Sequence, residues 1–234
     1  MSGDGPLGAR ARFLAAANTV TAGRPAQLCR ACVATLPVQR AAVVVHAERI
    51  GMEILCASDA IAERVEWFQA TLGEGPGWDA AGGSGPVVAT DLAADTQRWP
   101  SFAAAAVDAG VGAMYALPLQ VGAIKVGVLD LYRDTAGLLS NADFADAVAI
   151  AELVSAILLT VGREGLLTGE LGSWWDQSMS TRAVHQATGM VMVQLGVPAR
   201  DAYARLQAFA FADDRLINEV ALDVVARRLR LGRD

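Results

Sequence analysis

Two cysteines three residues apart are the first feature of this sequence that could do chemistry. Cys29 and Cys32 form a C-x-x-C pair, a spacing used by redox thiols and metal sites, and Cys56 is the third cysteine. The pair lies inside a predicted helix that begins near Pro25, whereas low-pKa redox thiolates lie at a helix N-terminus. A zinc site needs four ligands, and the sequence has no second pair. We therefore expect buried, reduced thiols, with redox sensing as the open alternative.

Two further features of the first 160 residues could bind a ligand. A glycine-rich segment spans 73–86. It contains no G-x-x-x-x-G-K-[ST], and no strand leads directly into it, so we expect tight turns and no phosphate cradle. His46 is the only histidine of this part of the chain and could ligate a haem. Because a lone histidine at a strand end is usually structural, we assign no metal and no cofactor here.

The charge distribution separates the two ends of the chain. Residues 1–172 hold 11 Lys and Arg against 18 Asp and Glu, whereas residues 173–234 hold 8 Arg against 7 acidic residues. The C-terminal segment is the only part that does not repel a phosphate backbone. Its weak positive charge predicts selective contacts with a nucleic acid, in contrast to the strongly basic surface of a nonspecific binder.

Periodicity places these residues on a framework of helices and strands. Helical spacing of apolar residues predicts helices over 13–20, 25–36, 61–72 and 100–109. Short apolar runs predict strands at 41–46, 52–56, 87–90, 113–120 and 124–132. Pro118 favours an edge or a bulge. Hairpin-linked strands interleaved with helices indicate an α+β domain with a mainly antiparallel sheet.

Four strings in this region resemble a GAF domain over residues 10–160. They are LGEGPG at 72–77, GPVVATDL at 85–92, LPL at 117–119 and GVLDLY at 127–132. The resemblance implies a sensory α/β fold with a pocket on one face of the sheet. The N-K…F-x-x-x-D-E pattern of the cyclic-nucleotide-binding subset is not present. We therefore expect no cyclic-nucleotide cofactor, and an unknown small-molecule ligand remains possible.

A long helix is expected to follow, capped by Asn141 or Asp143. Its apolar stripe suits packing on the sheet or pairing with a second copy of the chain. Glycines then recur, and each costs about 1 kcal/mol inside a helix relative to Ala. We expect a weak helical linker over 161–179 between the two domains, and a disordered tail over 1–9. With 53% apolar residues, both domains can bury a core.

The last segment, 180–234, reads as an all-α bundle of three helices. It resembles an ANTAR domain, a three-helix RNA-binding module of bacterial antiterminators, over residues 180–225. The family pattern is R-x-x-[IV]-x-x-A-K-G-x-L-M, then A-[YF]-x-x-L-R-x-x-A, then [LI]-x-x-V-A-x-x-[VI]. The residues that carry the resemblance are Arg182, Val184, Ala187, Gly189, Val191, Met192, Ala202, Tyr203, Leu206, Ala210, Ile217, Val220, Ala221 and Val224.

Six polar residues of this segment are the candidate RNA contacts. They are Arg182, Gln186, Thr188, Arg205, Gln207 and Arg215. Thr188 replaces the family's Lys of A-K-G and Gln207 replaces its Arg of L-R, both at expected polar surface positions. Two lost charges remove about two phosphate contacts, although Thr and Gln can still donate hydrogen bonds. Each Arg could alternatively be solvated or paired within the chain.

The sequence as a whole predicts a signal-responsive, non-enzymatic regulator of transcription antitermination. The resemblance implies tandem RNA stem-loops in nascent transcripts as the partner, bound by a homodimer. No signal peptide is present, and the longest apolar run, 147–161, is interrupted by Glu152, so we expect a cytoplasmic protein without membrane contact. The alternatives are a protein-interaction module without RNA binding, a haem or redox sensor, and a cysteine-dependent methionine sulfoxide reductase.

Overall fold

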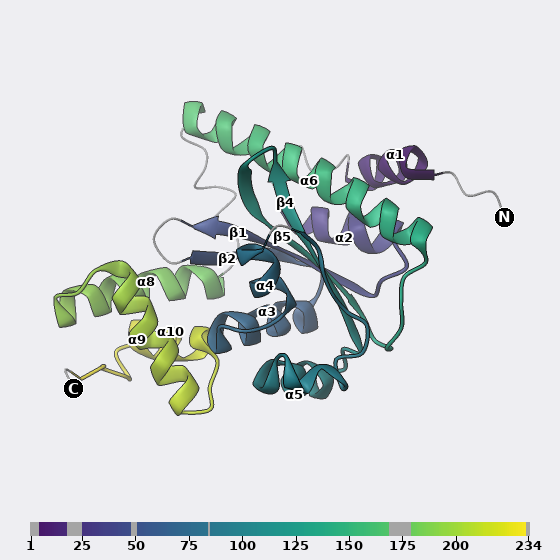
Figure 1. Ribbon diagram of the computed structural model, residues 1–234. Helices are drawn as coiled ribbons and strands as arrows, with labels where there is room; N and C mark the ends of the chain where they lie inside the picture. The colour runs from purple at the N-terminus through teal and green to yellow at the C-terminus, as the bar shows by residue number, and fades with distance from the viewer. Residues whose placement is uncertain (1–4, 18–24, 48–50, 84, 169–178, 233–234) are drawn as a thin grey trace.

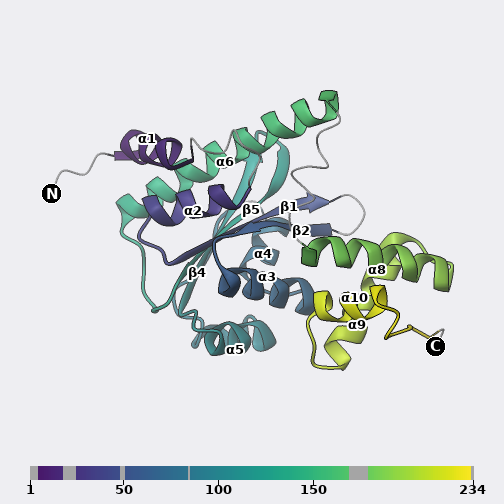
Figure 2. The same cartoon turned by 180° about the vertical axis from the view of Figure 1, so that it is seen from behind.

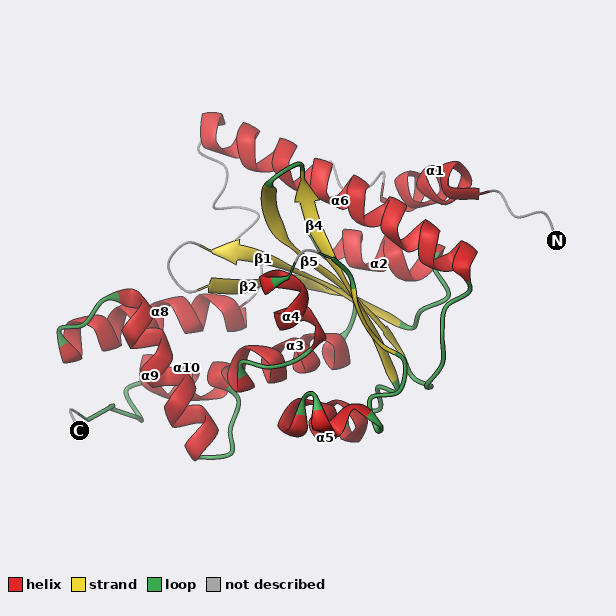
Figure 3. Cartoon of the chain, in the orientation of Figure 1, coloured by secondary structure: helices red, strands yellow, loops and turns green. Residues whose placement is uncertain are grey.

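The computed structural model describes residues 5–17, 25–47, 51–83, 85–168 and 179–232. A five-stranded antiparallel sheet has the order β2-β1-β5-β4-β3. Its strands are β1 (Arg40–Ala47), β2 (Gly51–Ala57), β3 (Val87–Ala89), β4 (Ala113–Val121) and β5 (Ile124–Arg133). The α+β class, the antiparallel sheet and both hairpins are therefore confirmed (Figure 3).

Close packing at the centre of the sheet explains two sequence features. A Cβ on Gly127 would lie 2.0 Å from the Val44 carbonyl oxygen, so only glycine lets β5 approach β1 at this point. Pro118 pairs with Val128 on β5, and β3 pairs only with residues 114–116 of β4. At Pro118, β4 therefore has a neighbouring strand on one side only, because β3 ends before it.

Helices cover both faces of the sheet (Figures 1 and 2). One layer holds α1 (Gly5–Ala17), α2 (Ala26–Thr35) and α6 (Asn141–Thr168). The other holds α3 (Ala60–Leu72), α4 (Pro76–Gly82) and α5 (Pro100–Asp108), with the 3-10 turn η2 (Asp95–Gln97) before α5. The sheet is thus buried on both faces between two apolar clusters.

Three details differ from the sequence predictions. Residues 5–9, expected to be disordered, form the start of α1. The glycine-rich segment contains α4, which Pro76 begins after Gly75 at φ 135°, in addition to the expected turns. The long helix α6 continues to Thr168, so it includes the first part of the expected linker; residues 169–178 lie outside the described chain.

Helix α6 is apolar because it is a core helix. By length and composition alone Asn141–Val161 could cross a membrane, despite the interruption at Glu152. In the structure Ala147, Ile150 and Val154 are fully buried in the cluster between this helix and the sheet. The burial of this face accounts for the apolar composition without a membrane.

The C-terminal helices α8 (Met179–Leu195), α9 (Ala199–Ala212) and α10 (Ile217–Val225) share a core of their own. Gly196, at φ 69°, ends α8 and Pro198 precedes α9, a common arrangement at a tight helix–helix turn. Asp214, at φ 51°, lies in the turn between α9 and α10. We call these three helices the C-terminal module.

Candidate functional site

The C-terminal module packs directly on helix α3 and the edge strand β2 (Figures 1 and 2). Ile54 of β2 and Trp67 of α3 are 6% and 5% exposed, and both belong to the apolar cluster of the module. The two domains therefore share one continuous core at this contact. Such a contact keeps water from the apolar faces of both partners.

Three hydrogen bonds join the domains around this shared core. Thr181 Oγ1 donates to the Ile54 carbonyl oxygen at 3.2 Å, and Gln207 Nε2 donates to the Ala70 carbonyl oxygen at 2.8 Å. The Ile217 amide at the start of α10 donates to Thr71 Oγ1 at 3.0 Å. Each of the three helices of the module thus contributes one hydrogen bond to the first domain.

A contact between a histidine and a buried carboxylate completes the docking contact. His185 Nε2 on α8 lies 2.6 Å from Glu53 Oε1 on β2, and the Glu53 side chain is only 5% exposed. Burial, and then the charge of Glu53, raise the pKa of the Tyr203 hydroxyl to about 12. Because a carboxylate enclosed in this way needs a partner, His185 helps to fix the module in place.

The six candidate RNA contacts divide into two groups. Arg182 and Gln186 on α8 and Arg205 on α9 are exposed. Thr188, expected at the surface, is 3% exposed, and its hydroxyl donates to the Val184 carbonyl oxygen at 2.7 Å. That surface assignment was wrong because the face of α8 that carries Thr188 turns into the core.

The other two candidates already have protein partners. Gln207 is half-buried and bound to the carbonyl of Ala70, as described above. Arg215 lies 2.6 Å from an Asp223 carboxylate oxygen and 3.6 Å from one of Asp213. Hydrogen bonds from Arg215 and Arg228 lower the pKa of Asp223. The alternative of an arginine paired within the chain therefore describes Arg215.

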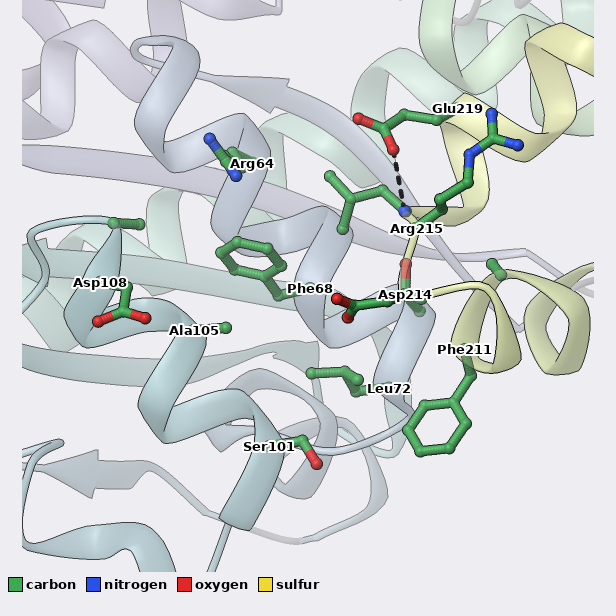
Figure 4. Close-up of a pocket in the computed structure, with 14 residues that line it drawn as sticks. Arg64, Phe68, Leu72, Ser101, Ala105, Asp108, Phe211, Asp214, Arg215 and Glu219 are labelled. Atoms are coloured by element: carbon green, nitrogen blue, oxygen red, sulfur yellow. Dashed lines mark hydrogen bonds between the residues drawn. The ribbon is translucent and has the colours of Figure 1, made fainter.

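Arg215 also borders a cleft of about 670 Å³ between the two domains (Figure 4). Helix α3 contributes Arg64, whose guanidinium carbon lies 5.5 Å from the centre of the Phe68 ring. Asp108 of α5 and Asp214 of the α9–α10 turn border the same space. Because the carboxylates of Asp108, Asp214 and Glu219 all line the cleft with the two arginines, the docked arrangement disfavours a phosphate there.

A pair of buried carboxyl groups lies beneath the docking contact. Glu66 of α3 and Asp130 of β5 are 3% and 0% exposed. Burial, and then the nearby charge of Asp130, raise the pKa of Glu66 well above its usual range. Burial also raises the pKa of Asp130 to about 7. No sequence motif marked this pair, although an Asp within the apolar run GVLDLY at 127–132 is the visible signal of a buried acid.

The cysteines are arranged differently from the expectation. Cys29 of α2 forms a disulfide with Cys56 of β2, and Cys32 remains as a buried thiol whose pKa is raised by burial to about 12. Burial is confirmed, but the expectation of three reduced thiols was wrong. Cys29 faces the sheet. It therefore pairs with Cys56 of β2, 27 positions along the chain, and not with Cys32, which lies one turn further along the same helix. His46 lies in β1, and its side chain is outside the described part.

Comparison with known proteins identifies the first domain by its fold. No family model matches the sequence, and no curated protein matches it either. A sensor histidine kinase domain from Sinorhizobium meliloti is similar in structure, with a TM-score of 0.51 and 18% identity over 65% of this chain and 97% of that chain. The GAF domain of an Acinetobacter phosphoenolpyruvate-protein phosphotransferase has a TM-score of 0.51 and 11% identity over 70% and 97%. The sheet domain has the GAF fold.

A second GAF domain, from the Coxiella burnetii phosphoenolpyruvate-protein phosphotransferase, agrees with this assignment. Its TM-score is 0.51, with 12% identity over 69% of this chain and 98% of that chain. The expected GAF domain is therefore supported by three domains of similar size. At this level of identity the likeness concerns the fold.

The interdomain hydrogen bond of Gln207 predicts how firmly the module docks. Gln207→Ala should weaken docking by about 1 kcal/mol, the net value of one hydrogen bond. Exchange of the Ile217 amide proton, which itself donates across the interface, should then accelerate roughly fivefold in NMR hydrogen exchange. Arg205→Ala, on the exposed face of the same helix, is the control and should leave this rate unchanged. Equal rates in the two variants would contradict the docking role of Gln207.

The raised pKa of Asp130 predicts a pH dependence of stability. Between about pH 3.9, the ordinary Asp value, and about pH 7 the folded state keeps a proton that the unfolded state has lost. The contribution of Asp130 is therefore complete below this window and is lost as pH rises through it. In the wild-type protein this effect lowers the free energy of unfolding, measured with urea, as the pH rises from 4.5 to 8. In Asp130→Asn the free energy of unfolding should fall less over the same range. The control Asp108→Asn, at an exposed position, should show the full wild-type decrease. If the free energy of unfolding of Asp130→Asn changes with pH as in the wild type, Asp130 does not have a raised pKa in the folded state.

Proposed function

We propose that this protein is a signal-responsive, RNA-binding regulator of transcription antitermination, without enzymatic activity. Its GAF-fold domain would sense a signal and control the C-terminal module, whose sequence resembles the ANTAR pattern. The proposed partner is a pair of stem-loops in a nascent transcript, bound by a homodimer in the cytoplasm. The observation that carries the proposal is the docking of this module on α3 through one of its own candidate RNA contacts.

Docking provides a physical route from sensing to RNA binding. One of the two N–H groups of Gln207 Nε2 is bound to the Ala70 carbonyl, so this side chain is held against α3 and is not free to turn toward RNA. Arg215 faces the interdomain cleft with acidic neighbours. Arg182, Gln186 and Arg205 remain exposed and form the accessible part of the proposed surface. In this proposal the docked state binds RNA weakly, and release of the module completes the contact surface.

The degree to which docking lowers the affinity for RNA depends on how rarely the module is released from α3. If the released state is populated to a fraction f, the apparent dissociation constant for RNA is the intrinsic one divided by f. A docking free energy of about 1.4 kcal/mol would hold binding back tenfold. A signal that favours either state of the first domain then changes RNA affinity without touching the RNA surface.

A charge placed in the docking contact should therefore increase RNA affinity. Ala70 is half-buried on α3 against the module, so Ala70→Glu should displace it, and binding to a tandem stem-loop RNA should tighten about tenfold. Ala104→Glu, at an exposed position of α5, is the matched control. Filter binding measures affinity, and circular dichroism checks that each variant is folded. Unchanged affinity in a folded Ala70→Glu protein would contradict control by docking.

The same assay distinguishes RNA binding from a protein-interaction role. In the Ala70→Glu background, Arg182→Ala or Arg205→Ala should weaken binding and reduce its salt dependence by about one phosphate contact each. A homodimer should bind tandem loops at least about 100-fold more tightly than a single loop, because the second contact is intramolecular. Absence of stem-loop binding by the released module would favour the protein-interaction alternative.

A further inference from the structure

The buried carboxyl pair beneath α4 has one member without a partner. Glu66 accepts hydrogen bonds from the Tyr132 hydroxyl and, at 2.9 Å, from Gln69 Nε2. The Gln69 side-chain oxygen accepts from the Gly77 amide at 2.8 Å. In the described part of the chain no N–H or O–H donor meets full hydrogen-bond geometry at either carboxylate oxygen of Asp130, and the polar side chains beside it are those of Glu66 and Gln69. A fully buried acid with two unsatisfied oxygens is costly unless something supplies donors.

A small cavity lies directly at this acid. Its volume is about 20 Å³, which is room for one group the size of a water molecule. The lining residues are Val44, Met52, Ile54, Glu66, Gln69, Ala70, Gly77, Trp78 and Asp130. None of these residues carries a positive charge. The cavity therefore combines two acidic groups, room for a single small group, and no cation from its own walls.

The chemistry of the walls selects the kind of cation. Divalent metals take about six to eight oxygen ligands, or keep several waters. The described residues include no group of three or more Asp, Glu, His or Cys side chains that could hold a metal. A protonated amine instead needs only a few acceptors around a positive nitrogen, and its N–H groups supply the donors that Asp130 lacks.

The outer side of the cavity suits a short organic substituent. Trp78 on α4 is 39% exposed, and Met52 is half-buried, whereas both acids are enclosed. An aromatic face next to a cation is attractive, and thioether and indole groups accept methylene groups. Among the lining residues, solvent thus reaches Trp78, Met52 and Ala70, whereas the two carboxyl groups are buried.

We propose that this cavity binds the protonated head of a small primary amine, either free ammonium or a short alkylammonium, with Asp130 as its main acceptor. Its binding is independent of any RNA activity. Its regulatory consequence rests on the proposed function: Ile54 and Ala70 line the cavity, and their carbonyl oxygens accept the hydrogen bonds of Thr181 and Gln207. A ligand that shifts β2 or α3 therefore acts on the docking contact itself.

Binding is linked to the protonation of the acids. Asp130 must be ionised to hold a cation, so affinity rises with pH through about 7, where this group titrates. The other titratable groups at the site are Glu66 of α3 and Tyr132 of β5; the lining residues from β1, β2 and α4 do not titrate. Alkylammonium groups resemble the Lys ammonium and stay charged to about pH 10.

Thermal unfolding in chloride salts at matched ionic strength tests the proposal. At pH 8, ammonium and methylammonium should raise the Tm in a concentration-dependent way, whereas potassium and tetramethylammonium should not. The shift should shrink strongly at pH 5.5. Asp130→Asn should abolish the shift and the exposed-site control Asp108→Asn should keep it. No Tm shift, an equal shift in all four salts, or an equal shift in Asp130→Asn would overturn the proposal.

Two further measurements make the outcome independent of variant folding and of the RNA activity. In wild-type protein, 15N-ammonium NMR should show a bound signal that methylammonium displaces and tetramethylammonium does not; absence of that signal overturns an ammonium site even if Asp130→Asn is unfolded. n-Propylammonium tests the size of the ligand. If it raises the Tm as much as methylammonium does, the site accepts an amine with a longer chain. If it does not raise the Tm, the ligand is free ammonium or methylamine. RNA affinity measured with and without ammonium then tests only the coupling.

Discussion

The structure depends on helix α3, which has to bury two faces at once. One face places Val65 and Glu66 against the sheet, and the other presents Trp67 and Thr71 to the C-terminal module. Asp59 caps its first turn by accepting from the Ala62 amide at 2.8 Å, and Gly73, at φ 66°, ends it. Because a helix is stiff over this length, a change on one face is carried to the other as a rigid shift.

Polar groups concentrate where these two faces meet the rest of the molecule. On the inner side they are the buried acids Glu66 and Asp130, and on the outer side the Glu53–His185 pair and the hydrogen bonds of Gln207 and Thr181. Buried polar groups are sensitive to small displacements, since each lost partner costs more than the bond contributed. The arrangement is therefore suited to switching between a few discrete states and less suited to gradual change.

Local patterns predicted the elements well and their partners poorly. Alternating apolar runs and turn signals located both hairpins and the antiparallel sheet, because hairpin pairing is decided by neighbours in sequence. The same patterns did not reveal that Cys29 pairs with Cys56, or that residues 5–9 join α1. Thr188 and Gln207 were placed at the surface by analogy of position, but the first enters the core of the module and the second contacts Ala70.

The sequence by itself determined the helix and strand composition, the GAF-like order of elements and the three-helix character of the C-terminal segment, since these follow from periodicity, glycines and prolines along the chain. Only the tertiary structure decided that the module docks on α3, that Arg215 is held by Asp223, and that Asp130 lies beside Glu66 at a small cavity. Docking joins residues 137 positions apart, the two acids come from a helix and a strand, and Arg215 and Asp223 are eight positions apart across the turn into α10. Their energies come from burial and proximity in space, which no local pattern encodes.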